Sequence, residues 1–283
     1  MKKIFNSFLI ISFLFIFFQN IAISVSCDDL KTTKKISQFI EKSYLSSPLL
    51  QKNISLTLSI DACENKGCKS KKKRSGEKEI LHILKYKNKS RIFAEKGPNA
   101  PRCLIKRGGR RFICSSCGAV SNENCRSFPS DENSIFPGTN IDTEDFKLTS
   151  KFGKESSCSK LKNPNFFKIE TKIDEGKSGS NNSYEKVISF YDKKKGVPIL
   201  MNFYAENVLR KVYRFYPKYY VKVGGQWFSS VMRVRTTLGS EKKFVFETLT
   251  HVNKKNGRLK LYLKISDDPN LKNVPPESLF STD

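Results

Sequence analysis

The feature that most constrains this chain is an alternation of apolar and polar residues with a period of two. The alternation is explicit over residues 54–60, and four long runs follow over 197–252, separated by the pairs Glu206-Asn207, Gly224-Gly225 and Gly239-Ser240. A period of two places successive side chains on opposite faces of a strand, and these pairs favour tight reversals of the chain. The pattern predicts a meander of antiparallel strands over 197–205, 208–223, 226–237 and 242–252.

The first part of the chain adds one helix and further strands. Ile36, Ile40 and Tyr44 recur at helical spacing, which predicts a helix over 28–47. Asp142 is expected to cap one short helical turn over 141–148. Period-two runs and a Gly108-Gly109 hairpin predict strands over 54–60, 78–87, 90–95, the two sides of 102–115, 164–174 and 183–191.

These elements predict an α+β fold that is mostly β, in a single domain over 27–283 with a cysteine-bearing insertion near 61–130. An antiparallel sheet of about ten or eleven strands tends to curl into an incomplete barrel, here over a helical lid. An apolar inner face with so little helical cover favours a ligand cavity, although a filled core is the simpler interpretation. The candidate cavity residues are Leu56, Leu58, Phe203, Val212, Phe215, Trp227, Val231, Phe244 and Phe246.

The N-terminus has the pattern of a signal peptide over 1–26. Two lysines precede an almost wholly apolar run over 8–18, and small residues follow up to Ser26. The protein is therefore expected to be exported, without a membrane-spanning segment. Cleavage before Cys27 leaves a second possibility, an acyl anchor on that cysteine.

The charge is strongly basic, with 52 Lys and Arg against 27 Asp and Glu and a formal net charge of +25. Such a charge attracts anionic surfaces, and an anionic membrane is the expected one. The basic run over 69–74 would indicate nucleic-acid binding in a cytosolic protein. Behind a signal peptide it is interpreted as an exposed loop, so nucleic acid is not an expected partner.

Motifs in the C-terminal half resemble those of a known family. They are Tyr184–Val187, the Asp192-Lys193 turn, Val197-Pro198, the turn Gly225–Trp227 and Thr248-Leu249, with weaker counterparts at 136–146 and 276–280. Together they resemble the outer-membrane lipoprotein-sorting protein family, which has the LolA/LolB-like fold. The resemblance covers most of residues 30–283 and is clearest after residue 183.

This resemblance implies an incomplete antiparallel barrel with a helical lid over a hydrophobic cavity, in the bacterial periplasm. Its expected ligand is an acylated lipoprotein or a lipid, and its expected partner is an inner-membrane exporter of the resistance-nodulation-division class. A carrier is physically necessary, because each methylene exposed to water costs about 0.8 kcal/mol.

The eight cysteines of an exported chain favour four disulfides. The Gly108-Gly109 hairpin places Cys103 opposite Cys114, at a separation that a disulfide accepts. The other expected pairs are Cys63–Cys68 and Cys117–Cys125, which close small loops, and Cys27–Cys158, which remains by elimination.

Alternative uses of these cysteines are weaker hypotheses. A zinc site would need Cys103, Cys114, Cys117 and Cys125, but only one Cys-x-x-Cys knuckle is present. A redox-active Cys114–Cys117 pair would lie in a β-rich region rather than at a helix N-terminus. The two histidines, His82 and His251, are distant in sequence and are interpreted as structural. We therefore expect no metal, no cofactor and no enzymatic activity.

The resulting hypothesis is a periplasmic, non-enzymatic carrier that shuttles acyl chains toward the outer membrane. The rival hypothesis is a disulfide-stapled surface or secreted adhesion module without a lipid ligand. An open apolar cavity favours the carrier, and a filled core favours the adhesion module.

Overall fold

The computed structural model describes residues 25–44, 54–64, 79–86, 89–97, 100–107, 110–115, 124–128, 139, 141, 142, 145, 146, 148, 153–174, 184–223, 226–229, 231–238, 243–252 and 260–261. Its helices are α2 (Thr33–Tyr44) and the 3-10 helix Pro217–Tyr219. Its strands are β1 (Ile54–Glu64), β2 (Glu79–Tyr86), β3 (Lys89–Lys96), β4 (Cys103–Arg107), β5 (Arg110–Cys114), β6 (Cys125–Phe128), β7 (Gly153–Lys160), β8 (Phe166–Ile173), β9 (Lys186–Asp192), β10 (Val197–Ala205), β11 (Val208–Phe215), β12 (Tyr220–Val223), β13 (Gln226–Ser229), β14 (Val231–Leu238), β15 (Lys243–Val252) and β16 (Lys260–Leu261). None of these described helices has the length and apolar character that crossing a membrane requires.

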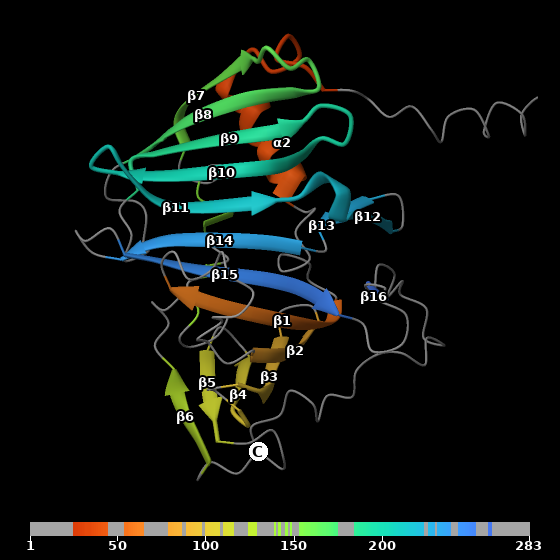
Figure 1. Ribbon diagram of the computed structural model, residues 1–283, viewed down its shortest axis with the longest axis vertical. Helices are drawn as coiled ribbons and strands as arrows, with labels where there is room; N and C mark the ends of the chain where they lie inside the picture. The colour runs from red at the N-terminus through yellow and green to blue at the C-terminus, as the bar shows by residue number, and fades with distance from the viewer. Residues whose placement is uncertain are drawn as a thin grey trace, which may run out of the picture.

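The strands form one large antiparallel sheet and one small hairpin. The main sheet has 14 strands in the order β6-β5-β4-β3-β2-β1-β15-β14-β11-β10-β9-β8-β7, with β16 beside β1, while β12 and β13 pair separately (Figure 1). The expected class, mostly antiparallel β with one helix, is confirmed. The expected number of about ten or eleven strands is too low. Among the described strands, β6 and β7 are the two edge strands of the sheet, and they do not pair with each other. The sheet is therefore open rather than a closed barrel.

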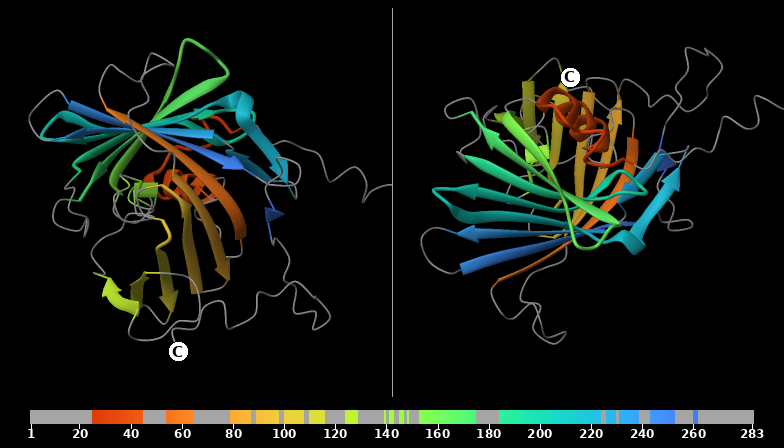
Figure 2. Two further views of the ribbon diagram at one scale, coloured as in Figure 1. Left: turned by 60° about the horizontal axis from the view of Figure 1, so that its bottom comes forward. Right: turned by 90° about the horizontal axis from the view of Figure 1, so that it is seen from above.

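The sheet bends near β1, so that two arms face α2. One arm consists of β2 to β6 and the other of β7 to β11, and the views in Figure 2 show α2 on the concave side between them. A single hydrophobic core joins Ile36 and Ile40 of α2 with Leu81 of the first arm and Phe203 of the second. The region 61–130, expected to be an insertion, supplies β2 to β6 and is therefore one arm of the main sheet.

Helix α2 is shorter than expected, because its start is set by a threonine. The Thr32 hydroxyl accepts the Lys35 backbone N–H at 3.3 Å, as a residue at the N-terminal cap does. Asp29, expected near the helix start, instead accepts the Ser26 backbone N–H and hydroxyl in the preceding turn. Residues 45–47 of the expected helix lie outside the described residues.

A disulfide joins the chain before α2 to an edge strand. Cys27 is bonded to Cys158 of β7, as elimination had predicted. A sulfur that is held in a disulfide cannot also carry a thioether-linked acyl chain. This disulfide and acylation at Cys27 therefore exclude each other.

The cysteine-rich hairpin has the expected register but a different disulfide. Cys103 lies opposite Cys114 across β4 and β5, and Arg107 lies opposite Arg110. However, Cys114 also lies opposite Cys125 on its other side, and the disulfide joins Cys114 to Cys125. The expected Cys103–Cys114 and Cys117–Cys125 pairs are therefore wrong, because Cys114 has two cross-strand neighbours. The expected Cys63–Cys68 pair falls outside the side chains that the structure describes.

The predicted meander is correct in order but not in continuity. The turn Glu206-Asn207 has positive φ at both residues, 53° and 58°, as a tight hairpin turn requires. The run over 208–223 is not one strand, because Pro217 begins a 3-10 turn after β11. The chain then forms the β12–β13 hairpin before it returns to the main sheet as β14.

The Cys27–Cys158 disulfide gives a direct test of the fold. It closes a loop with a sequence separation of 131 residues. Replacing both cysteines with serine should lower the free energy of unfolding by about 3–5 kcal/mol, because the unfolded chain regains loop entropy. Urea unfolding of the double variant measures this loss. Equal stability of the variant and the parent would show that the loop contributes nothing.

Candidate functional site

The concave face of the main sheet is the candidate functional site. The described side chains that both arms bury there are mostly apolar or aromatic, with Glu79, Thr171, Ser189 and Lys211 as the polar ones. The apolar ones include Leu81, Ile83, Ile92, Leu104, Ile113, Met201, Met232 and Val234. The face is therefore a continuous hydrophobic surface that is partly covered by α2.

A second piece of chain covers the same face beside α2. We call it the inner segment, and define it by the described residues Thr139, Ile141, Asp142, Asp145, Phe146 and Leu148, all of which are buried. Phe146 contacts the rings of Tyr44, Tyr213 and Phe215, with centroids 6.1, 4.9 and 6.2 Å apart. The interior around Phe146 is thus filled by the chain itself.

A buried ion pair ties the inner segment to the sheet. The Lys211 Nζ of β11 donates to the Asp145 Oδ2 at 2.6 Å, with only 3% and 2% of the two side chains exposed. The Tyr213 hydroxyl donates to the same oxygen at 2.5 Å and accepts the Asp142 backbone N–H at 3.3 Å. Either charge alone would be costly at this depth, so each side chain requires the other.

Three tyrosines of the core are almost fully buried. Burial, followed by the negative charge of Asp145, raises the pKa of the Tyr184 and Tyr213 hydroxyls. Burial raises the pKa of Tyr191, which packs against Phe39 and Phe167, to about 12. All three tyrosines are therefore neutral at physiological pH, and Tyr213 also hydrogen-bonds to Asp145.

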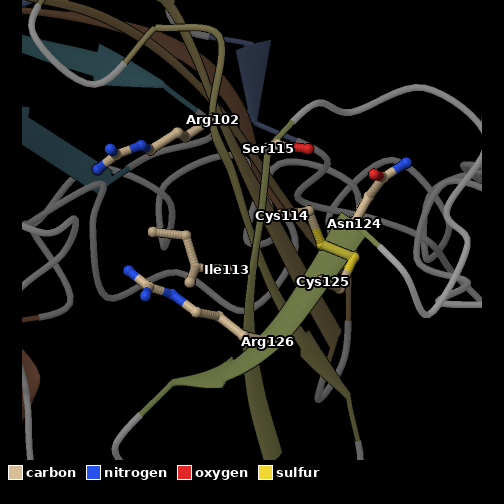
Figure 3. Close-up of a pocket in the computed structure, with 7 residues that line it drawn as sticks. All are labelled: Arg102, Ile113, Cys114, Ser115, Asn124, Cys125 and Arg126. Carbon is tan, nitrogen blue, oxygen red and sulfur yellow. A yellow bond between two sulfur atoms is a disulfide. The ribbon is translucent and has the colours of Figure 1, made fainter.

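The concave face opens into a pocket at the end of the first arm, which we call the arginine pocket. Its volume is about 390 Å³, and it is lined by Arg102, Ile113, Cys114, Ser115, Asn124, Cys125 and Arg126. Figure 3 shows the side chains of Arg102, Ile113 and Arg126 extending to the same side of the strands. Because Ile113 belongs to the main core, this side is the concave one.

A second hollow, the outer groove, lies on the opposite face of the sheet. Its volume is about 340 Å³, and it is lined by Leu200, Asn202, Leu209, Val212, Arg214, Arg233 and Arg235. These positions alternate with buried core residues such as Met201 and Tyr213. Neither α2 nor the inner segment covers this face.

The predicted cavity residues do not line a single cavity. Phe203 and Phe215 are buried on the concave face, where Phe203 contacts Tyr184 and Tyr213, with ring centroids 5.1 and 5.6 Å apart. Val212 and Val231 are only partly buried and lie on the opposite face, because they alternate with the buried residues of β11 and β14. Sequence alternation identified the strands but not which of their faces meets the core.

Trp227 lies on β13, at the margin of the core. It packs against the core cluster, and the Lys195 Nζ lies 5.2 Å from its ring centroid. For the other four candidates, the structure describes only which residues they face on the neighbouring strand. Leu56 and Leu58 lie opposite Ile83 and Leu81, and Phe244 and Phe246 lie opposite Thr237 and Arg235. Lipid binding by all these residues stays a prediction.

The charged residues of the site were missed. Asp145 falls within the short helical turn expected over 141–148, and Lys211 falls within the strand expected over 208–223, and neither was singled out as a site residue. The sequence did contain one signal for Lys211. Lys211, Tyr213 and Phe215 are spaced two residues apart on β11, so Lys211 lies on the same core-facing side as the two aromatic residues. Arg102 and Arg126 were hidden within the cysteine-rich region.

Two alternative interpretations of the cysteines are wrong. Cys103, Cys114 and Cys125 are all disulfide-bonded, so they cannot supply thiolates to zinc. Cys114 is bonded to Cys125 rather than to Cys117, so no Cys114–Cys117 redox pair forms. In the part of the chain that the structure describes, no cluster of His, Cys, Asp or Glu has the arrangement of a metal site.

His82 has a structural setting, as predicted. Its imidazole contacts the Glu95 carboxylate and stacks on Phe93, with ring centroids 6.0 Å apart. These residues alternate with the core residues Leu81 and Ala94 and thus lie away from the concave face.

The architecture is similar to that of three solved structures. A putative outer membrane lipoprotein-sorting protein domain from Vibrio parahaemolyticus has a TM-score of 0.52 at 13% identity, over 82% of this chain and 94% of that one. A LolA superfamily protein from Nitrosomonas europaea gives 0.51 at 12%, over 81% and 94%. A DUF1329 family protein from Desulfovibrio piger gives 0.51 at 12%, over 84% and 95%.

The chain therefore has a LolA-like fold, and the resemblance that its motifs indicated is confirmed at the level of the fold. Comparison of the sequence with protein-family models and with curated proteins found no match.

The buried ion pair predicts a large and specific effect on stability. Replacing Lys211 with methionine should lower the free energy of unfolding by about 3–5 kcal/mol, because the Asp145 carboxylate then stays buried without its cation. The double variant Lys211→Met/Asp145→Asn should lose less than the sum of the two single variants. Urea unfolding measures all three.

The exposed pair of Lys172 and Glu155, at 2.8 Å, provides the control. Replacing Lys172 with methionine should change stability little, because that pair lies in water. Equal effects of the two lysine substitutions would contradict the role assigned to Lys211.

The buried tyrosines predict a loss of stability at alkaline pH. Their pKa values are higher in the folded protein than the value of 10.0 for a free tyrosine, so the unfolded chain releases these protons first. The stabilisation is complete below about pH 10 and decreases as the pH rises toward 12 and beyond. Urea unfolding between pH 8 and pH 11.5 should show this decrease, and the variant Tyr191→Phe should show a shallower one. A free energy of unfolding that is constant over this range would overturn the assignment.

Proposed function

We propose that this protein is an exported, non-enzymatic carrier of acyl chains, which binds a lipid or the acyl groups of a lipoprotein against the concave face. The observation that carries the proposal is the continuous apolar surface of that face, which opens into the arginine pocket beside Ile113. The LolA-like fold supports it, because one of the similar structures is described as a lipoprotein-sorting protein domain.

The apolar character of the face suits such a ligand. A bound acyl chain would contact side chains of β2, β3 and β4 such as Ile83, Ile92 and Leu104, which are apolar and already buried, so the acyl chain would have to replace whatever covers them. At about 0.8 kcal/mol for each buried methylene, a chain of about ten carbons would gain roughly 8 kcal/mol before the cost of ordering it. Such binding is tight enough for transport and weak enough for release.

The inner segment sets a condition on this mechanism. Phe146 fills the interior near Phe215, so an acyl chain that reaches this part of the face must displace the inner segment. The Lys211–Asp145 ion pair holds the segment in place when no ligand is bound. The carrier would thus keep its interior closed to water when it is empty.

Location and partners follow from the same proposal. An exported carrier of this kind would act in the bacterial periplasm and deliver toward the outer membrane. An exporter of the resistance-nodulation-division class and an anionic membrane surface are its proposed partners. The lysines of the β9–β10 turn and of β12, such as Lys194 and Lys222, are exposed and would meet an anionic membrane.

One observation favours the rival adhesion module. Phe146 packs against the rings of Tyr213 and Phe215 as a residue of an ordinary core does, which is what a module without a ligand would show. An experiment on the concave face therefore has to distinguish a binding surface from a packed core.

Two bulky substitutions make this distinction. Ile113→Trp fills the arginine pocket on the concave face, and Val212→Trp fills the outer groove on the opposite face. Native mass spectrometry after incubation with a triacylated lipopeptide and with a phospholipid measures binding. We expect adducts with the parent and with Val212→Trp, and about tenfold fewer with Ile113→Trp, because an indole there blocks the chain.

Adducts that are lost with Val212→Trp but kept with Ile113→Trp would place the ligand in the outer groove. That result would show that the concave face is not the binding surface. No adduct with the parent protein would favour the adhesion module. Thermal unfolding of both variants checks that they are folded.

A further inference from the structure

The arginine pocket has a chemical character that the proposed function does not require. Arg102 and Arg126 are exposed, and both extend to the same side as Ile113 between them (Figure 3). A site for an acyl chain alone would need only apolar side chains. Two guanidinium groups beside an apolar side chain instead match a ligand with a negative group at one end and a hydrocarbon at the other.

The described residues of the strands that line the pocket carry only positive charge. Lys106 and Arg111 lie opposite each other on β4 and β5 and alternate with Leu104 and Ile113, so they share the concave side with the two arginines. None of the described residues of β4, β5 and β6 is acidic. The nearest acid of β3, Glu95, contacts His82 and lies on the other side of the sheet, because it alternates with the buried Ala94. The guanidinium groups therefore face no carboxylate from the described residues of β3, β4, β5 or β6. The buried Glu79 of β2 shares the concave side but lies beyond β3.

The apolar side of the pocket continues into the main core. Ile113 lies opposite Leu104, which lies opposite Ile92, which lies opposite Ile83. All four side chains belong to the core cluster. A hydrocarbon chain that starts at the pocket can therefore run across β5, β4, β3 and β2 along one face of the sheet.

The neighbouring disulfide holds the pocket in shape. Cys114 follows Ile113, Cys125 precedes Arg126, and the bond between them joins β5 to β6 at that point. Arg126 thereby keeps its place opposite Ile113 even though β6 is an edge strand of only four residues. A binding group held in its bound position loses less entropy when the ligand arrives.

We propose that the arginine pocket binds the phosphate head group of an anionic lipid, with Arg102 and Arg126 as the two cationic ligands and Ile113 as the start of the acyl-chain path. This inference rests on the proposed function and makes it more specific, because it selects anionic lipids over neutral ones. Arginine suits this role because its planar group donates paired hydrogen bonds to phosphate and stays charged at every physiological pH.

The test compares two lipids with the same acyl chain. Oleoyl lysophosphatidic acid has a phosphate head group, and monooleoylglycerol has none. Both displace an environment-sensitive fluorescent probe from the purified protein, below their critical micelle concentrations, and inorganic phosphate is titrated as a third ligand. We expect the parent protein to bind lysophosphatidic acid about 10- to 100-fold more tightly than monooleoylglycerol, since charge-assisted hydrogen bonds to the phosphate are strong, although solvent weakens them at this exposed site.

The double variant Arg102→Gln/Arg126→Gln should lose this preference and bind the two lipids equally. Arg214→Gln is the matched control, because it also removes an exposed arginine but lies in the outer groove. It should keep the preference. Both arginines of the pocket are exposed, so the double variant should keep the melting temperature of the parent.

The other outcomes separate the two proposals. If the parent binds both lipids equally, or if the double variant keeps the preference, the head-group site is wrong while the carrier stands. If neither lipid binds, the proposed function itself fails. If inorganic phosphate competes as strongly as lysophosphatidic acid, the pocket is a site for free phosphate rather than for a lipid.

Discussion

The structure depends on one constraint: a wide, bent antiparallel sheet has an apolar concave face that has to be covered. Helix α2 covers part of it through Ile36 and Ile40, and the inner segment covers another part through Ile141 and Phe146. At the end of the first arm this cover gives way to the arginine pocket beside Ile113. The same surface that stabilises the empty protein is thus the surface on which a hydrocarbon chain would bind.

The ion pair between Lys211 and Asp145 gives this cover a particular character. A wholly apolar segment would be held only by non-directional packing, whereas Asp145 makes two directional hydrogen bonds, to Lys211 and Tyr213. A buried ion pair contributes little net stability but penalises every arrangement in which one charge lacks its partner. The segment therefore has a well-defined position, and the proposed ligand would have to provide enough binding energy to replace it.

Much of the fold was predictable from local pattern. The run that became β1 alternates strongly, and the turn Glu206-Asn207 has positive φ at both residues, which asparagine tolerates well. The edge strand β7 was missed because its sequence, GKESSCSK, is polar and half exposed and shows no apolar alternation. Strand β6 has only four residues, too few to establish a period.

The candidate site was less predictable, because it depends on which face of each strand meets the core. Alternation cannot separate Phe203, which is buried, from Val212, which lies on the opposite face. Likewise, the register of the hairpin placed Cys103 opposite Cys114 correctly, but the disulfide depends on β6, which approaches from the other side. Asp145 and Lys211 are 66 residues apart in sequence, so their contact depends on the tertiary fold and no local pattern predicts it.

In the proposed mechanism, an acyl chain that reaches the centre of the concave face replaces the inner segment there. Hydrogen–deuterium exchange of the protein, with and without saturating lysophospholipid, measures this displacement. We expect amides of residues 139–148 to exchange faster in the complex, while those of β9 and β10 stay protected. Saturated binding that leaves exchange in the inner segment unchanged, or slows it, would show that the segment is not displaced.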